Sequence, residues 1–94
     1  MERDDSHWIV GQSYFIRTVT HVLTGRLIKL TDLDIVLTDA AWICETERFS
    51  DSIRTGAFRE VETYGDQPVI VGRGGLIDAT EWLHPLPRTS LPKE

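Results

Sequence analysis

The chain has 94 residues, of which 40% are hydrophobic and 27% are charged, and this composition is that of one soluble globular domain and excludes two. A domain of this length buries only roughly 60% of the surface that its unfolded chain exposes, so it gains stability from self-association. Acidic residues outnumber basic ones by 15 to 10, and the formal net charge of -5 excludes a whole-surface attraction for nucleic acid.

Three strands are predicted in the first half of the chain. Residues 13–20 alternate aromatic and β-branched side chains, and residues 26–31 resume the alternation after Thr24-Gly25. An acidic turn then precedes a third strand over residues 35–43. The links are short, which favours an antiparallel meander.

The second half predicts one short helix and two more strands. Residues 47–55 have Phe49 and Ile53 four residues apart, with Thr46 as N-cap and Gly56 as C-terminal stop. Extended residues 57–66 follow, and then come the apolar strand 69–71, a glycine-rich turn and the strand 76–82. Five short strands and one helix predict a mainly β fold, a small barrel.

The last residues, 84–94, form a proline-rich tail. Pro85, Pro87 and Pro92 exclude both a helix and the interior of a sheet. We expect a frayed terminus, and the alternative is an arm that lies on a neighbouring subunit. The predicted domain spans residues 1–83, with a helical insertion at about 45–57.

The order of these signals resembles the Sm/LSm and Hfq family. The second family motif is matched by VIVGRGGLIDA, residues 69–79, in which Arg73-Gly74 stands at the Arg-Gly pair of the family. The first motif is matched within residues 11–41 by these residues: Gly11, Phe15, Val19, Gly25, Leu27, Asp32, Leu37, Asp39 and Ala40.

This resemblance implies a strongly bent, five-stranded antiparallel barrel, with the helix inserted between the third and fourth strands. Edge strands of such barrels pair between subunits and close a homo-oligomeric ring of about five to seven copies. The segments expected at this subunit interface are the two apolar strands, namely Ile35, Val36 and Leu37 together with Val69, Ile70 and Val71.

The resemblance also implies a nucleic-acid site. Sm proteins bind uracil with an Asn between the second and third strands, stack the base on the preceding side chain, and clamp it with the Arg of Arg-Gly. Here Leu33 and Asp34 stand near the first two positions, and Arg73 and Gly74 supply the pair. The chain contains no Asn, and a carboxylate cannot donate a hydrogen bond to a base carbonyl. RNA binding is therefore the alternative hypothesis.

A longer stretch of the chain is similar to a group of short proteins encoded by bacteriophages and by phage-like regions of bacterial genomes. The strings that carry this likeness are YFIRTVTH, TGRL, DAAWI, ERFSD and GAFREVE, and they lie within residues 14–82. The likeness implies a phage or host protein as a further partner. The corresponding locations are the bacterial cytoplasm or the virion.

Catalytic and metal-binding patterns are not found in the sequence. His7, His21 and His84 are too scattered for a zinc signature, and Cys44 is a single cysteine, so we expect no metal and no cofactor. Cys44 is also expected to be a buried structural residue. The three tryptophans are expected in a core or an interface, with base stacking as the alternative.

The favoured hypothesis is therefore a non-enzymatic ring protein, a structural or accessory interaction module associated with phage. It is expected to avoid membranes, because the start MERDDSH has no apolar run of the signal-peptide kind and no stretch is long enough to span a bilayer.

Overall fold

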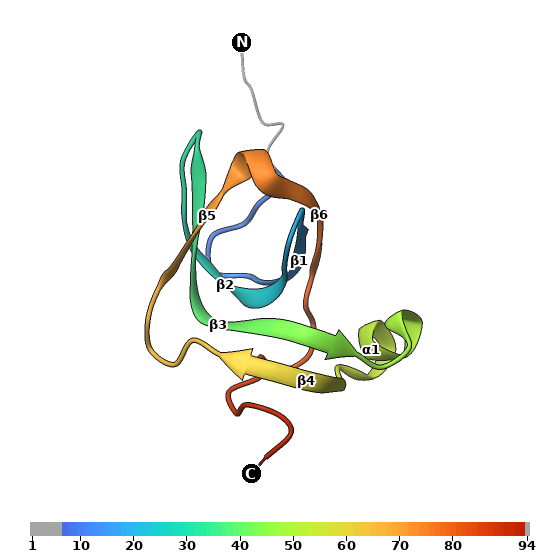
Figure 1. Cartoon of the computed structure of the whole chain (residues 1–94). Coiled ribbons are helices and arrows are strands. Elements are labelled where there is room, and N and C mark those ends of the chain that lie inside the picture. Colours follow the sequence, from blue (N-terminus) through green and yellow to red (C-terminus); the bar gives the residue numbers. More distant parts are fainter. Residues whose placement is uncertain (1–6, 94) are drawn as a thin grey trace.

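The computed structural model describes residues 7–93, so the acidic start MERDDSH lies outside the described residues apart from His7. The described chain forms a single antiparallel sheet of six strands, with one α-helix and one turn of 3-10 helix (Figure 1). The elements in chain order are β1 (Ser13–Thr18), β2 (Val22–Leu30), β3 (Asp34–Thr46), α1 (Phe49–Thr55), β4 (Phe58–Thr63), β5 (Val69–Gly72), η1 (Arg73–Gly75) and β6 (Leu76–Glu81).

The sheet is organised around β3, its longest strand. One edge of β3 pairs with β2, and β1 and β6 follow in the order β3-β2-β1-β6. The other edge of β3 pairs with two strands in succession, with β5 along residues 34–37 and with β4 along residues 41–46. The mainly β fold with a single short α-helix is thereby confirmed.

The expected strand count of five was wrong, because residues 57–66 contain a sixth strand, β4. Its buried side chains, Phe58 and Val61, are three residues apart, whereas a regular strand buries every second residue. Register shifts in the pairing of β3 with β4 allow this spacing. The irregular spacing is why the sequence pattern did not identify the strand.

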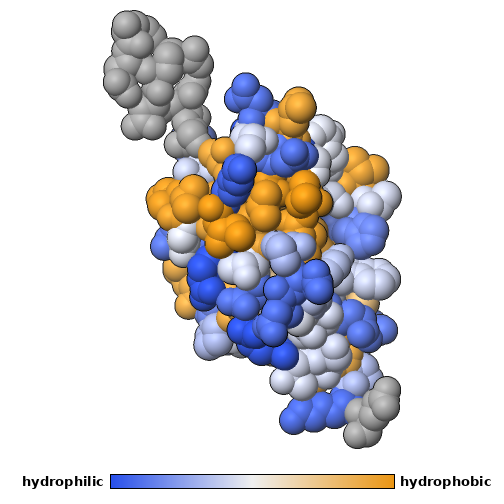
Figure 2. All heavy atoms as spheres, turned by 90° about the vertical axis from the view of Figure 1, so that its left-hand side faces the viewer, coloured by the Kyte–Doolittle hydropathy of each residue, from blue (hydrophilic) through white to orange (hydrophobic). Residues whose placement is uncertain are grey.

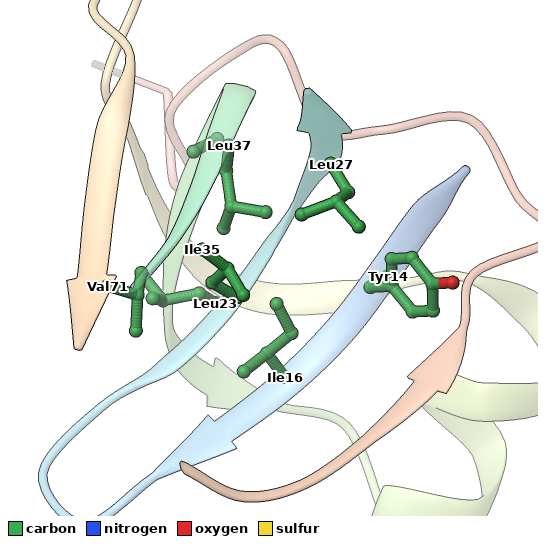
Figure 3. Packing of buried hydrophobic residues seen from close by; sticks show 8 residues of the cluster. Tyr14, Ile16, Leu23, Leu27, Ile35, Leu37 and Val71 are labelled. Carbon is green, nitrogen blue, oxygen red and sulfur yellow. The ribbon is translucent and has the colours of Figure 1, made fainter. Parts of the chain in front are cut away.

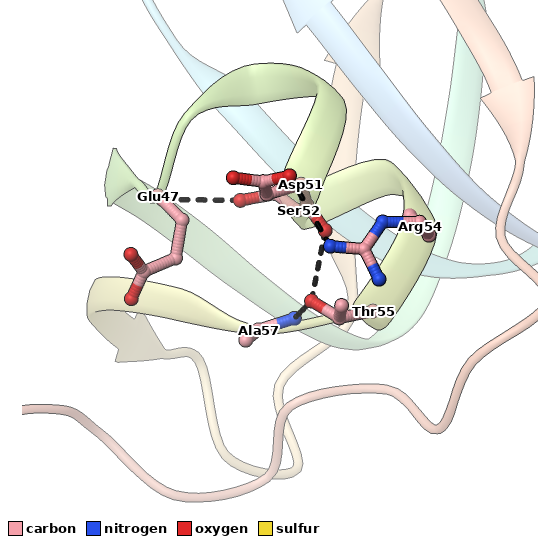
Figure 4. Close-up of polar contacts among 6 residues, drawn as sticks. All are labelled: Glu47, Asp51, Ser52, Arg54, Thr55 and Ala57. Atoms are coloured by element: carbon pink, nitrogen blue, oxygen red, sulfur yellow. Dashed lines mark hydrogen bonds and ion pairs between the residues drawn. The ribbon is translucent and has the colours of Figure 1, made fainter.

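The helix starts two residues later than expected. Thr46 is not its N-cap, because Thr46 pairs with Phe58 in the β3–β4 ladder. The N–H of Glu47 instead donates to the hydroxyl of buried Ser52 at 3.0 Å, which ties the end of β3 to the helix (Figure 4). Gly56 ends α1 as expected, with a φ of 79° and its N–H donating to the Ser52 carbonyl.

A sharp bend divides β3 into halves that serve different parts of the sheet. Asp39 has a φ of 51°, and the β2–β3 register shifts beside it, between Thr24 and Arg26. The Asp39 carboxylate accepts a hydrogen bond from Arg26 at 2.7 Å and pairs with Arg88 at 2.9 Å. The two guanidinium groups compensate the charge of the half-buried carboxylate.

The first hydrophobic core lies inside the curl of the sheet, between β1, β2, the first half of β3, and β5 (Figure 3). Trp8 and the half-buried Leu30, Val69 and Leu76 pack against it. Its buried members are Tyr14, Ile16, Leu23, Leu27, Ile35, Leu37, Ala40 and Val71.

The second hydrophobic core lies on the opposite face of β1. Phe15 points into it, although Tyr14 and Ile16 on either side point into the first core, so β1 is buried on both faces. Its buried members are Phe15, Ala41, Ile43, Phe58, Val61 and Trp82, with half-buried Val22, Ile53, Leu86 and Leu91 against them.

The expectation of a frayed tail was wrong as far as residue 93. The tail folds back on the second core, where His84 Nε2–H donates to the Ile53 carbonyl at 2.7 Å and Leu91 bridges Val61. Prolines exclude a regular ladder, yet Leu86 and Leu91 still bury apolar surface.

Candidate functional site

The residues expected to contact nucleic acid do come together, at the junction of the β2–β3 turn and η1. The Arg73 N–H donates to the Leu33 carbonyl at 2.8 Å, and the Arg73 guanidinium donates to the Thr31 carbonyl at 2.6 Å. Thr31 closes the turn, since its hydroxyl accepts hydrogen bonds from the N–H groups of Leu33 and Asp34. These bonds fix Arg73 against the turn.

The chemistry of this junction is mixed. The Leu33 side chain is 77% exposed, and Gly74 is also exposed. The exposed Asp32 and the half-buried Asp34 lie on either side of Leu33, whose carbonyl accepts the hydrogen bond from Arg73. Two carboxylates repel a phosphate backbone, and part of the hydrogen-bonding capacity of the guanidinium is already used by Thr31. One copy therefore offers an apolar tip and a partly engaged arginine.

The residues expected at the subunit interface pair with one another inside the chain. Residues 35–37 of β3 face residues 69–71 of β5, in the pairs Ile35–Val71, Val36–Ile70 and Leu37–Val69. The other edge of residues 35–37 is taken by β2. The backbone of residues 35–37 is thus flanked on both edges and offers no pairing surface, which corrects the expectation for this segment.

The outer edge of β5 is open among residues 7–93, since β5 pairs with β3 alone. Backbone groups alternate between the two edges of a strand. Arg73 donates towards β3, so Val71 and Val69 also face β3, whereas the N–H and C=O of Ile70 face outwards. The Ile70 side chain is itself 70% exposed.

A groove of about 390 Å³ runs along this open edge. It is lined by β5, by Tyr64, by Gly75 and by the β1–β2 turn, which contributes Thr20 and His21. Figure 2 shows hydrophobic side chains gathered in the upper part of this side of the molecule, the side on which β5 lies in Figure 1. The edge thus combines unpaired backbone groups with apolar surface.

A second open edge belongs to β6, which pairs with β1 alone in the described part of the chain. The Trp82 N–H donates to the Ser13 carbonyl in β1, so by alternation the backbone groups of Ala79 and Glu81 face outwards, and the pairing with β1 shifts register at Ile77. Residues 77–81 are exposed, and the Ile77 side chain is 60% exposed. The sequence analysis named no residue of β6 as a candidate site residue, because side-chain alternation is the same in a strand whose outer edge is paired and in one whose outer edge is open.

The remaining chemical candidates do not form a site. Cys44 is half-buried, and its burial, followed by the charges of Glu60 and Glu62, raises the pKa of its thiol. Trp82 is buried in the second core, whereas Trp42 is exposed and contacts His21. Within residues 7–93, no three His, Cys, Asp or Glu side chains gather in a metal-binding arrangement.

Comparisons of the chain with protein-family models, curated proteins and solved structures found no match. None of the helices in the described chain combines the length and the apolar character needed to cross a membrane.

Proposed function

We propose that the protein is a non-enzymatic, ring-forming interaction module, in which the open edge of β6 in one copy pairs with the open edge of β5 in the next. The observation that carries this proposal is the pair of open edges at the two ends of one sheet. The two edges belong to different strands, so each copy contacts two neighbours through head-to-tail interfaces. Such interfaces close into a ring when the rotation that relates one copy to the next returns to the first copy.

The outward groups of the two edges are suited to each other. Ile70 and Ile77 place exposed apolar side chains on β5 and β6, and the outward-facing backbone groups of Ile70 and Ala79 lie on the same two edges. A solvent-exposed apolar edge strand favours pairing with a further strand. The domain is also small, so burial of these edges adds stability that one copy lacks.

We further propose that the sheet is an Sm-like barrel whose fourth strand is divided. β4 and β5 together follow β3 as one strand would, interrupted by residues 64–68, and η1 carries Arg73-Gly74 between β5 and β6. In this interpretation the extra strand comes from a break in one long strand. A phage-associated role in the bacterial cytoplasm or the virion remains part of the proposal.

RNA binding is the second candidate, and the contact between Arg73 and the β2–β3 turn favours it. In a ring, the same arginine repeats in every copy, and the summed positive potential can attract phosphate even on an acidic protein. The same experiment tests both candidates.

The test is native mass spectrometry of protein purified without nuclease, comparing the unmodified chain with Ile70→Pro and Ala79→Pro. In each variant, proline removes one backbone N–H that faces away from the sheet. The hydrogen bonds of β5 to β3 are kept in Ile70→Pro, and those of β6 to β1 are kept in Ala79→Pro. We expect one discrete oligomer for the unmodified chain and folded monomers for both variants. Mixing the variants should restore one intact interface and produce a heterodimer.

Two controls sharpen the result. Ile70→Ala keeps the N–H and separates the side-chain contribution from the backbone contribution. Val71→Pro removes a donor to β3 and should unfold the chain instead. An Ile70→Pro protein that is folded and still forms the unmodified oligomer would refute the β5–β6 interface, and an oligonucleotide bound to the unmodified ring would establish RNA binding.

A further inference from the structure

The outer edge of β4 is covered by the chain's own tail. The Val61 N–H donates to the Leu91 carbonyl at 2.9 Å, and the Leu91 N–H donates to the Val61 carbonyl at 2.8 Å. The Thr63 N–H donates to the Ser90 hydroxyl at 3.2 Å. These are outward-facing groups of β4 that a neighbouring strand would otherwise pair with.

The tail offers a further strand fewer backbone donors than a regular edge strand does. Pro85, Pro87 and Pro92 have no N–H and interrupt the row of donors that such a strand requires. Contacts distant from β4 hold the tail in place, namely the hydrogen bond from His84 to α1 and the ion pair between Arg88 and Asp39. Burial of Leu86 and Leu91 adds an apolar contribution.

The two strands that pair with this edge of β3 therefore differ. The tail covers the outer edge of β4, whereas the outer edge of β5 is open among the described residues. We propose that residues 84–93 are an edge guard, a strap that occupies a second strand-pairing surface on β4 and confines self-association to β5. The effect on ring formation rests on the proposed function, whereas the covering of β4 stands without it.

The strand that fits the uncovered β4 edge is β6 of a second copy. Both edges present outward backbone groups, and an antiparallel register that places Val61 opposite Ala79 brings Arg59 opposite Glu81 and Glu62 opposite Asp78, whose carboxylate accepts a hydrogen bond from Arg17. The favourable pair and the like-charged pair offset each other, so this pairing is driven by the backbone hydrogen bonds that both edges leave unmade. The guard would thus prevent β4 from competing with β5 for the same β6 edge.

The test releases the tail within the full-length chain. Ser90→Ala/Leu91→Asp removes the acceptor for Thr63 and places a carboxylate against the second core, close to Glu62, whose carboxylate lies 3.5 Å from the Ser90 hydroxyl. The substitutions are made in an Ile70→Pro background, in which β5 is blocked. Lys93→Gln in the same background is the control, because it changes the net charge equally at an exposed position.

Sedimentation velocity and amide hydrogen exchange are the measurements. We expect the released variant to self-associate, the Lys93→Gln control to behave as the Ile70→Pro parent, and the Val61 and Thr63 amides of the released variant to exchange faster at low concentration. Adding Ala79→Pro should return the released variant to a monomer, whereas non-specific aggregation of an exposed core would persist.

The proposal is overturned if the released variant exchanges faster at Val61 and Thr63 and yet does not self-associate, or if Ala79→Pro leaves its association unchanged. Unchanged exchange at these amides would overturn it as well, because the tail would then not be what covers them. The exchange of the Val61 and Thr63 amides does not depend on whether the unmodified chain forms a ring through β5, and the association measurement requires only that the Ile70→Pro parent is a monomer. The covering of β4 and the β5–β6 interface are therefore tested separately.

Discussion

The two hydrophobic cores share β1 but are built in different ways. The first core is assembled almost entirely from successive strands of the meander, β1, β2 and β3, with Val71 of β5 added. The second core joins Phe15, near the start of the chain, to Phe58, Trp82 and the tail. Contacts between neighbouring strands follow from the local pattern, whereas the second core depends on segments that are far apart in sequence.

The difference has a consequence for assembly. The first core positions β5 and leaves its outer edge open, whereas the second core anchors the tail over the edge of β4. The second core, which is the harder of the two to predict from the sequence, therefore determines that the outer edge of β4 is covered while that of β5 is not.

The largest expected effect comes from removing the centre of the second core. Phe15 stacks on Phe58 and Trp82, with ring centroids 6.1 and 5.4 Å apart, and also meets Phe49 edge to face. Phe15→Ala should lower the free energy of unfolding by about 3–5 kcal/mol, because it removes this packing and leaves a cavity. Urea denaturation followed by tryptophan fluorescence measures the loss, and a loss below about 1 kcal/mol would contradict a central role for Phe15.

A smaller effect is expected at the bend in the first core. A Cβ on Gly25 would lie 3.0 Å from Leu37 Cβ and 3.4 Å from Ala40 Cβ, so these side chains in β3 would have to move away. Gly25→Ala should therefore destabilise the chain by about 1–3 kcal/mol through overpacking. The same denaturation measures it, with Gly74→Ala as control, since nothing lies within 4 Å of a Cβ at Gly74. Equal stability of the two variants would show that the bend tolerates a side chain.

The smallest effect is expected outside both cores, at the exposed ion pair that joins β6 to β1. The Arg17 guanidinium hydrogen-bonds to the Asp78 carboxylate and lowers the pKa of that carboxyl. A lowered pKa in the folded state stabilises the fold above the ordinary pKa of Asp, and this stabilisation is lost as the pH falls through the lowered value. Asp78→Asn should therefore lower Tm slightly at pH 7, and the difference from the unmodified chain should vanish in acid.

Thermal unfolding at a series of pH values measures this difference. Asp66→Asn is the control, because Asp66 is fully exposed and its contact with Arg88 is 3.7 Å long. A difference between Asp78→Asn and the unmodified chain that stays constant into acid would show that the pair does not act through its charge.

Much of the first core could be predicted from the sequence. Alternation predicted the strands β1, β2, β3, β5 and β6, and Gly56 marked the end of α1. The turn between the first two strands was wrongly expected at Thr24-Gly25, because these residues are paired inside β2. The turn of Leu33 and Asp34 and the Arg73-Gly74 pair were also placed in one candidate site, where the Arg73 N–H meets the Leu33 carbonyl.

The second core could not be predicted in the same way. Phe15 alternates with Tyr14 and Ile16, which in a sheet covered on one face would leave Phe15 exposed, yet it is buried as well. Phe58 and Val61 have irregular spacing, and a proline-rich tail is ordinarily a frayed end. Local patterns report which residues are apolar, but not which distant segment covers them.

The sequence by itself determined that the protein is a small, acidic, mainly β domain, because side-chain alternation and turn residues act over a few positions. Only the tertiary structure decided that residues 35–37 are paired on both edges, that β5 and β6 have open edges within residues 7–93, and that the tail covers β4. The physical reason is that alternation specifies the face that a strand buries, whereas the pairing of its edges depends on where the rest of the chain places its backbone.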